Sequence, residues 1–171
     1  MRIVEGTQKA GGFKFAIVVS RYHDFVTNRL EGAAVAALVQ AGVAQNDITV
    51  VRVPGAFEIP IAARHAAETG EYAAVVCLGC LIRGETAHFE YIASAVSHGL
   101  SSAAGDTGVP MSFGVLTTNS AEEALARAGD GPSNKGWEAA AAAIEMAVIF
   151  RRIRDADRIA SRSASRPDVD R

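Results

Sequence analysis

Four short runs rich in valine and isoleucine, separated by stretches with helical spacing of apolar residues, constrain the fold of this chain most strongly. Strands that alternate with helices predict a parallel sheet with right-handed crossovers and helices on both of its faces. We therefore expect an α/β fold, a three-layer sandwich around a four-stranded parallel sheet. The runs suited to buried strands are Phe15–Ser20, Ile48–Val53, Ala73–Leu78 and Met111–Thr117. The helical patterns cover Asp24–Ala41, Glu58–Thr69, Thr86–Ala104, Ala121–Ala128 and Trp137–Ile153.

The length of the chain fits one domain. With 171 residues, of which 49% are apolar and 21% charged, the chain has the balance of a globular protein that buries a sizeable core. We expect this single domain to cover residues 1–154. Because the end of the chain is dominated by Arg, Ser and Asp and contains Pro167, we expect residues 155–171 to form a polar, disordered tail.

The charge distribution argues against a nucleic-acid partner. Residues 1–150 contain 10 basic and 15 acidic side chains, whereas residues 151–171 contain 7 and 4. An acidic body is a poor match for nucleic acid, whose binding depends on many Lys and Arg contacts to phosphate. The N-terminus lacks the apolar segment of a signal peptide, and no apolar stretch is long enough to span a bilayer. We expect a cytoplasmic protein that binds neither nucleic acid nor membranes.

The two cysteines, Cys77 and Cys80, form a C-x-x-C pattern. A redox pair needs its nucleophilic thiol at a helix N-terminus, whereas Cys77 lies inside a strand-like run. Two thiols are also only half of a structural zinc site. We interpret both as reduced, buried cysteines and expect no metal.

Ligands of open parallel sheets bind outside the carboxyl ends of the strands, which directs attention to the segment Gly79–His88. Its residues Arg83-Gly84-Glu85-Thr86 directly precede a predicted helix, where unpaired backbone N–H groups and the positive helix end favour an anion. The alternative is a turn that Gly84 permits and a helix that Thr86 caps. The chain contains neither G-x-x-x-x-G-K-[ST] nor G-x-G-x-x-G, so neither a nucleoside triphosphate nor a dinucleotide is indicated.

His88 is the strongest candidate for proton transfer. It lies in the first turn of the predicted helix, beside the expected anion loop, and its imidazole titrates near neutral pH. A lone histidine is more often structural, and only the position in the cleft favours a functional role. His23 is a weaker candidate, and His65 and His98 lie within helices.

The loops after the first two strands offer groups for a polar ring compound. In Gly55-Ala56-Phe57-Glu58, Phe57 provides apolar surface and Glu58 provides acceptors for the hydroxyls of a polyol or sugar. The alternative is a Pro-Gly turn followed by a first-turn Glu that complements the helix dipole. Tyr22, just past the first strand, is suited to stacking on a planar ring or to packing.

Phe113 lies at the beginning of the fourth strand, at the end opposite these loops. It cannot easily reach the site of its own chain. It is either ordinary core or a residue that a neighbouring subunit supplies.

Three segments closely resemble lumazine synthase, an enzyme of riboflavin biosynthesis: Pro54–Pro60 (PGAFEIP), Leu78–Phe89 (LGCLIRGETAHF) and Gly114–Thr118 (GVLTT). Asn134-Lys135-Gly136 before an Ala-rich helix also fits, and the resemblance runs from about Ile3 to Arg154. It implies a flavodoxin-like subunit that joins 5-amino-6-(D-ribitylamino)uracil to 3,4-dihydroxy-2-butanone 4-phosphate. The products are 6,7-dimethyl-8-ribityllumazine, phosphate and water, and the resemblance implies no cofactor and no metal.

The resemblance also implies roles for individual residues. His88 matches the residue of proton transfer, while Phe113, Arg127 and Lys135 match positions that the adjacent subunit supplies. The implied substrate-binding residues are Tyr22, Ala56, Phe57, Glu58, Cys80, Leu81, Ile82, Glu85, Thr86, Phe113, Arg127 and Lys135.

Family members form homopentamers, and in some the pentamers pack into icosahedral capsids; the short turn Gly129–Asn134 resembles the capsid-forming kind. The resemblance further suggests riboflavin synthase as a partner. Two alternatives are a homologue that binds flavin or lumazine without turnover and a shell scaffold. Intact His88, Arg127 and Lys135 favour the enzyme.

Overall fold

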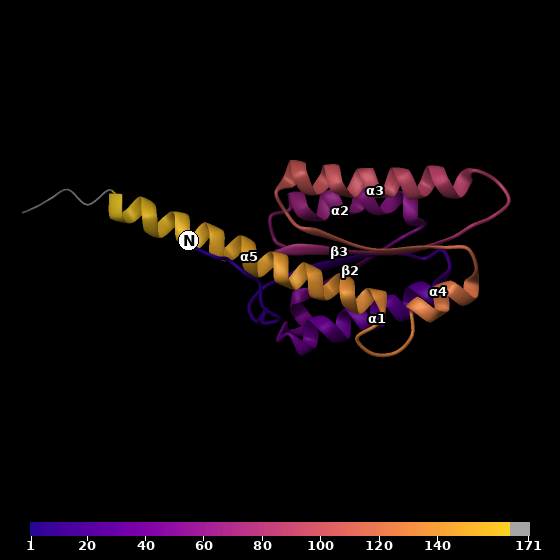
Figure 1. The fold of residues 1–171 in the computed structure, drawn as a ribbon, viewed down its shortest axis with the longest axis horizontal. Coiled ribbons are helices and arrows are strands. Elements are labelled where there is room, and N and C mark those ends of the chain that lie inside the picture. Colours follow the sequence, from indigo (N-terminus) through magenta and orange to yellow (C-terminus); the bar gives the residue numbers. More distant parts are fainter. Residues whose placement is uncertain (165–171) are drawn as a thin grey trace, which may run out of the picture.

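The computed structural model describes residues 1–164, with side chains for residues 1–156 and Arg158. A four-stranded sheet in the order β2-β1-β3-β4 lies between two layers of helices (Figure 1). The strands are β1 (Phe15–Ser20), β2 (Ile48–Val53), β3 (Ala74–Ile82) and β4 (Met111–Thr118). The helices are α1 (Asp24–Gln40), α2 (Ile59–Glu68), α3 (His88–Thr107), α4 (Ala121–Arg127) and α5 (Lys135–Ala164), with short 3₁₀ turns at Gln45–Asp47 and Ala56–Glu58.

All three strand pairs are parallel, so the predicted four-stranded parallel sheet and the flavodoxin-like α/β fold are confirmed. The two central strands, β1 and β3, are the most apolar, and every residue of β1 is buried. Strands covered on both faces need apolar side chains at every position, which explains why they read as continuous Val- and Ile-rich runs.

The side chains of β1 alternate between two cores. Phe15 and Ile17 belong to the core beneath α1, α4 and α5, whereas Ala16 and Val18 belong to the core beneath α2 and α3. Figure 1 shows these two helical layers on opposite sides of the sheet. Within residues 1–164, no helix combines the length and the apolar character that crossing a membrane requires.

Strand β3 is longer than the predicted Ala73–Leu78. It continues to Ile82 because its backbone pairs with β4 as far as Ile82↔Thr118. The segment that follows is therefore a short loop, residues 83–87, and α3 begins at His88 instead of the predicted Thr86.

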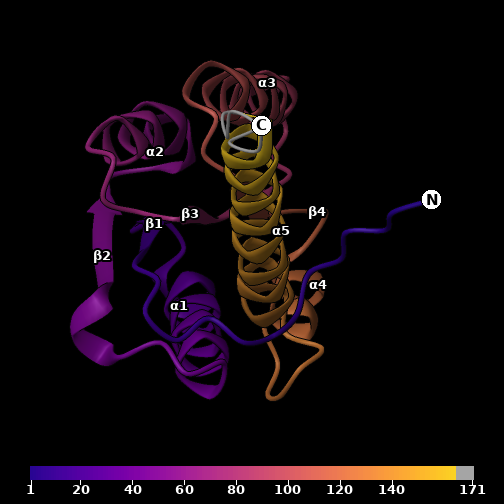
Figure 2. The ribbon, with the colours of Figure 1, turned by 90° about the vertical axis from the view of Figure 1, so that its left-hand side faces the viewer.

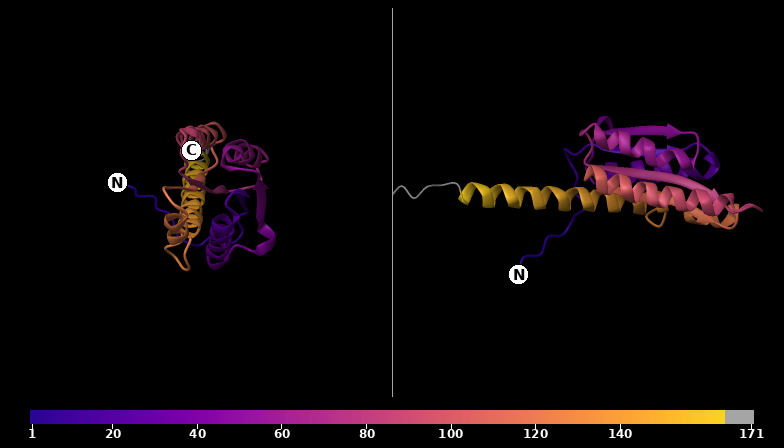
Figure 3. Two further views of the ribbon diagram at one scale, coloured as in Figure 1. Left: turned by 90° about the vertical axis from the view of Figure 1, so that its right-hand side faces the viewer. Right: turned by 90° about the horizontal axis from the view of Figure 1, so that it is seen from above.

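Helix α5 is also longer than predicted, and it contradicts the expected tail boundary. It continues to Ala164, ten residues past position 154, and projects from the body of the protein (Figures 1 and 3). Residues 137–164 contain neither Gly nor Pro and are rich in Ala and Arg, which are good helix formers. Polar composition was therefore a poor guide to disorder here. The rest of the predicted tail, residues 165–171, lies outside the described residues.

Two arginines connect α5 to the N-terminal part of the chain, which crosses α5 in Figure 2. The Arg151 guanidinium lies 4.0 Å from the centroid of the Phe13 ring, a cation–π contact. Arg152 Nη1 donates a hydrogen bond to the Glu5 carbonyl at 2.6 Å. These contacts hold the N-terminal segment against the helix.

The closest approach of two helices provides a test of this packing. A Cβ atom on Gly136, at the start of α5, would lie 2.1 Å from the Leu30 carbonyl oxygen of α1. We expect Gly136→Ala to destabilise the protein by about 1–3 kcal/mol or more, because backbone atoms cannot move aside as a side chain can. Urea unfolding followed by circular dichroism would measure the change.

Gly105→Ala is the matched control. A Cβ at Gly105, in α3, meets nothing within 4 Å, so this variant should be about 0.5–1 kcal/mol more stable than the wild type. An unchanged unfolding midpoint for Gly136→Ala would show that α1 and α5 are not held at this distance.

Candidate active site

A cleft of about 870 Å³ opens at the carboxyl ends of the strands, and most of the own-chain residues predicted for the site meet there. We call it the α2/α3 cleft, after the helices whose beginnings border it. Its lining residues are Tyr22, His23, Gly55, Ala56, Phe57, Glu58, Leu81, Ile82, Gly84, Thr86, His88, Phe89 and Ile92.

The turn between β2 and α2 holds a carboxylate in this cleft. Glu58 Oε2 accepts a hydrogen bond from the Gly55 N–H at 2.9 Å, and Pro60 occupies the first turn of α2, where its missing N–H costs nothing. The other oxygen, Oε1, accepts no hydrogen bond from residues 1–164. Glu58 therefore presents one fixed acceptor to a ligand with hydroxyl groups.

Two aromatic side chains are unusually exposed in the same cleft. Tyr22 is 65% exposed and Phe57 is 58% exposed, although rings of this size usually bury most of their surface. They come from different loops, after β1 and after β2. Exposed aromatic rings in the lining of one cleft are suited to a planar ligand.

The loop of residues 83–87 is held by Arg83. Its Nε donates to Asn119 Oδ1 at 3.2 Å, its Nη1 pairs with the Glu90 carboxylate, and its guanidinium lies 4.4 Å from the Phe89 ring centroid. The hydrogen bond from Arg83 lowers the pKa of Glu90. Arg83 thus ties the loop to the end of β4 and to the first turn of α3 instead of facing an anion.

His88 is the first residue of α3, and its side chain is exposed to the cleft. Its backbone N–H donates to Thr86 Oγ1 at 3.4 Å, across the turn before the helix. The N-cap residue is Ala87, and no side chain in the described part of the chain caps α3, so the prediction that Thr86 caps this helix is wrong. Glu85 is exposed and does not line the cleft.

Both cysteines are buried and unpaired, as the sequence predicted. Burial raises the pKa of Cys80 to about 11 and raises that of Cys77 further, so both remain thiols at neutral pH. Cys80 belongs to the core beneath α1 and α5, while its neighbour Leu81 lines the cleft on the other face of the sheet. The structure therefore does not bring the Cys80 side chain to the candidate site.

Three predicted site residues lie elsewhere, in a groove of about 400 Å³ between β4 and α5. Phe113, on the edge strand β4, is 49% exposed. Arg127 Nη1 donates to the Glu123 carbonyl at 3.0 Å, and Lys135 Nζ lies 2.8 and 2.7 Å from the two Glu138 carboxylate oxygens. The residues predicted to come from an adjacent subunit are thus separate from the α2/α3 cleft in their own chain.

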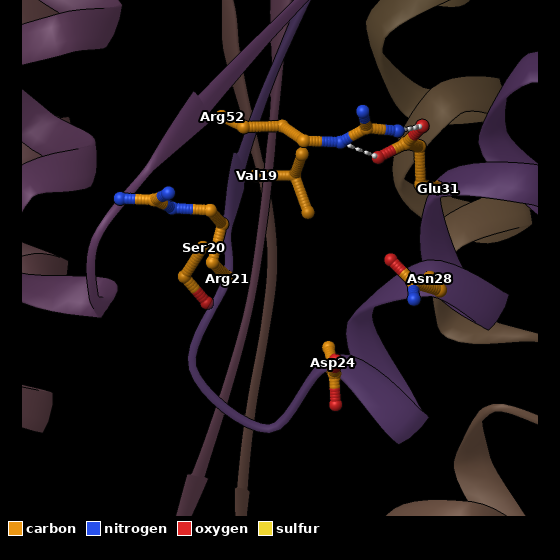
Figure 4. Close-up of a pocket in the computed structure, with 7 residues that line it drawn as sticks. All are labelled: Val19, Ser20, Arg21, Asp24, Asn28, Glu31 and Arg52. Atoms are coloured by element: carbon orange, nitrogen blue, oxygen red, sulfur yellow. Dashed lines mark hydrogen bonds and ion pairs between the residues drawn. The ribbon is translucent and has the colours of Figure 1, made fainter.

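A third cavity, of about 450 Å³, lies between α1 and β2 and contains none of the predicted site residues (Figure 4). Arg52 and Glu31 span it with hydrogen bonds of 3.1 and 2.5 Å. Arg21 and Asp24 line the same cavity, at the turn from β1 into α1. Its most prominent interaction is an ion pair that joins a strand to a helix.

Sequence reasoning underrated one residue of the α2/α3 cleft. His23 lines it beside Tyr22, although the sequence placed His23 behind His88. The backbone of His23 is in the left-handed conformation, which composition and the spacing of residues do not predict. In the part of the chain that the structure describes, no group of three or more His, Cys, Asp or Glu residues is arranged to hold a metal ion.

Comparison with known proteins agrees with the motifs that line the cleft. The sequence model of the 6,7-dimethyl-8-ribityllumazine synthase family matches residues 12–151. A curated relative, the 6,7-dimethyl-8-ribityllumazine synthase of Syntrophus aciditrophicus (strain SB), is 50% identical over 151 residues, which span 88% of this chain and 98% of the relative. The resemblance seen in the motifs is confirmed, and the chain belongs to the 6,7-dimethyl-8-ribityllumazine synthase family.

Proposed function

We propose that this chain is the transferase that condenses 5-amino-6-(D-ribitylamino)uracil with 3,4-dihydroxy-2-butanone 4-phosphate. The products are 6,7-dimethyl-8-ribityllumazine, phosphate and water, in riboflavin biosynthesis. The observation that supports the proposal is the α2/α3 cleft, whose lining combines two exposed aromatic rings, a carboxylate that accepts from the Gly55 N–H and an exposed imidazole.

The amine substrate occupies the aromatic side of the cleft. Tyr22 stacks on the pyrimidine, and Leu81 and Ile82 border the ring from β3. Ala56, Phe57 and Glu58 hold the ribityl chain, with the Glu58 carboxylate accepting from its hydroxyls. The largely exposed rings of Tyr22 and Phe57 and the acceptor that Glu58 presents support this placement, because neither needs to be uncovered before the ligand enters.

The phosphorylated ketone occupies the loop side. The backbone of residues 83–87 and the first turn of α3, a helix of 20 residues, direct N–H groups and the positive helix end toward the phosphate. Glu85 contributes its backbone and Thr86 its hydroxyl. The anchoring of the loop by Arg83 supports this role, because a fixed set of donors stabilises an anion better than a mobile one.

The remaining groups come from an adjacent copy of the chain. Phe113, Arg127 and Lys135 lie in the β4/α5 groove, on the exposed edge of the sheet, where a neighbour can dock. A contact between two different surfaces of identical subunits forms a ring when the rotation from one subunit to the next closes, and a homopentamer with one site at each interface is such a ring. We further propose a cytoplasmic assembly in which pentamers pack into an icosahedral capsid, with riboflavin synthase as a partner.

The chemistry requires few protein groups. The amine attacks the ketone and loses water to form an imine. Phosphate then leaves, and tautomerisation produces a new carbonyl. Attack of the ribitylamino nitrogen on that carbonyl closes the ring and releases a second water, which completes the lumazine. Holding two reactants in register contributes most of the acceleration, and the anion loop stabilises the departing phosphate. His88 moves protons between the reacting groups.

Mixing the purified protein with both substrates tests the proposed reaction. Lumazine fluorescence should appear together with an equal amount of phosphate. Folded, assembled protein that forms neither product would overturn the proposal. Sizing the native particle distinguishes a free pentamer from a capsid.

His88→Ala should slow turnover without abolishing it, by at most about the 100- to 10,000-fold that is typical of general acid–base groups. The measurement is kcat at saturating concentrations of both substrates. His65→Ala, which removes an exposed histidine of α2 outside the cleft, should leave kcat unchanged and serves as the control. An unchanged kcat for His88→Ala would remove His88 from the mechanism.

Arg127→Ala should raise the KM of the phosphate substrate by about tenfold or more, because one charged hydrogen-bonding partner of the phosphate is lost. The KM of ribitylaminouracil should change little. If only ribitylaminouracil binding suffers, the assignment of Arg127 to the phosphate is wrong.

The two variants together test the shared site. In rings reassembled from equal amounts of His88→Ala and Arg127→Ala chains, about a quarter of the interfaces would combine an intact His88 with an intact Arg127. At concentrations of the phosphate substrate below the wild-type KM, where both variants are slow, activity should therefore exceed that of either variant alone. Activity no higher than the mean of the two variants would place both residues in the same subunit's site.

A further inference from the structure

His23 has an unusual backbone. With φ 60° and ψ 49°, it is the single non-glycine residue of positive φ among residues 1–164. Most side chains avoid this left-handed conformation, although histidine enters it more readily than most. Strained backbone of this kind persists where the surrounding structure enforces it and gathers at functional sites.

Helix capping does not explain this conformation. The His23 carbonyl accepts hydrogen bonds from Val26 and Thr27 at 2.9 and 3.0 Å, but its side chain makes no capping bond to α1. A typical N-cap residue has an extended backbone and a short side chain that accepts from the first turn. The His23 side chain has a different set of contacts.

The His23 ring packs edge-on between two aromatic rings. Its centroid lies 4.4 Å from that of Tyr22, at an interplanar angle of 61°, and 5.8 Å from that of Phe25, at 85°. Edge-to-face pairs of this kind are favourable. His23 is half-buried while Tyr22 is largely exposed, so the histidine supports one side of the tyrosine ring and leaves other surface open to the cleft.

The turn that carries Tyr22 is very short. Arg21 is still bound to the sheet, through a hydrogen bond from its N–H to the Val53 carbonyl at 2.8 Å, and α1 begins at Asp24. Figure 4 shows the turn from Arg21 to Asp24. Only Tyr22 and His23 lie between these fixed points, so the backbone angles of His23 set the direction in which the chain enters α1 from Tyr22.

We infer that His23 is a positioning residue, whose left-handed backbone and edge-on ring fix the Tyr22 ring in the α2/α3 cleft. It thereby sets the affinity for the planar ring of the amine substrate and leaves the phosphate substrate unaffected. The identity of the ring rests on the proposed function. Burial lowers the pKa of His23, so the supporting ring is neutral at neutral pH and acts by packing instead of charge.

Two substitutions separate the backbone from the ring. His23→Gly accepts positive φ without strain and deletes the ring. His23→Phe restores an aromatic edge without the ring nitrogens. His98→Ala is the control, because the His98 ring bonds only within α3, to Ser94.

The measurements are the unfolding midpoint in urea, the KM of each substrate, kcat, and the Kd of 6,7-dimethyl-8-ribityllumazine from its fluorescence. For His23→Gly we expect a midpoint at or above that of the wild type. The Kd of the lumazine and the KM of ribitylaminouracil should rise about three- to tenfold, as expected for the loss of one aromatic pair. The KM of the phosphate substrate and kcat should stay within about twofold, and His23→Phe should recover most of the lost affinity.

Several outcomes would overturn the inference. Unchanged lumazine affinity in His23→Gly would show that Tyr22 needs no support. A His23→Phe variant as weak as His23→Gly would show that the imidazole contacts the ligand directly. A fall in kcat at unchanged Kd would indicate proton transfer. Lumazine binding is measured without turnover, so absence of the reaction in the wild type would contradict the proposed function and leave this test intact.

Discussion

The pairing of β3 with β4 determines the layout of both the α2/α3 cleft and the groove between β4 and α5. Their parallel register runs without interruption from Val75↔Met111 to Ile82↔Thr118. Because successive side chains of a strand point to opposite faces, this register directs Leu81 into the α2/α3 cleft and Cys80 into the other core. A slip of one residue would exchange the two.

The same ladder leaves β4 at the edge of the sheet, so the residues predicted for the site lie on two separate surfaces of the chain. Phe113 is half exposed on that edge, beside the groove that contains Arg127 and Lys135. His88 and Glu58 lie in the other cleft. Under the proposed function, these two surfaces form a complete site only when a second copy of the chain brings them together. A weaker interface between copies would then also be a weaker site.

The sequence predicted what depends on local chemistry and missed what depends on tertiary contacts. Val- and Ile-rich runs located all four strands, and the rule of strand carboxyl ends located Glu58 and His88. The end of β3 was missed because Gly79 and Cys80 have little strand preference of their own, and it is pairing with β4 that extends the strand. Helix α5 was predicted too short because the Arg and Ser residues of its last turns were interpreted as a sign of disorder. A solvent-exposed helix has the same polar composition. The role of His23 in the cleft was underrated, because a positive φ leaves no trace in a pattern of apolar spacing.

The projecting end of α5 lies far from the α2/α3 cleft, the candidate active site, so it offers a separate point of attachment. Helix α5 begins near the loops at the carboxyl ends of the strands and runs back past the opposite end of the sheet (Figure 1). At 1.5 Å per residue, its last ten described residues extend it by about 15 Å. A fluorescent domain or a surface tether joined beyond the end of α5 would stand clear of the α2/α3 cleft. The projecting end of α5 therefore acts as a spacer, and a form that is immobilised or fused through it should keep the cleft accessible.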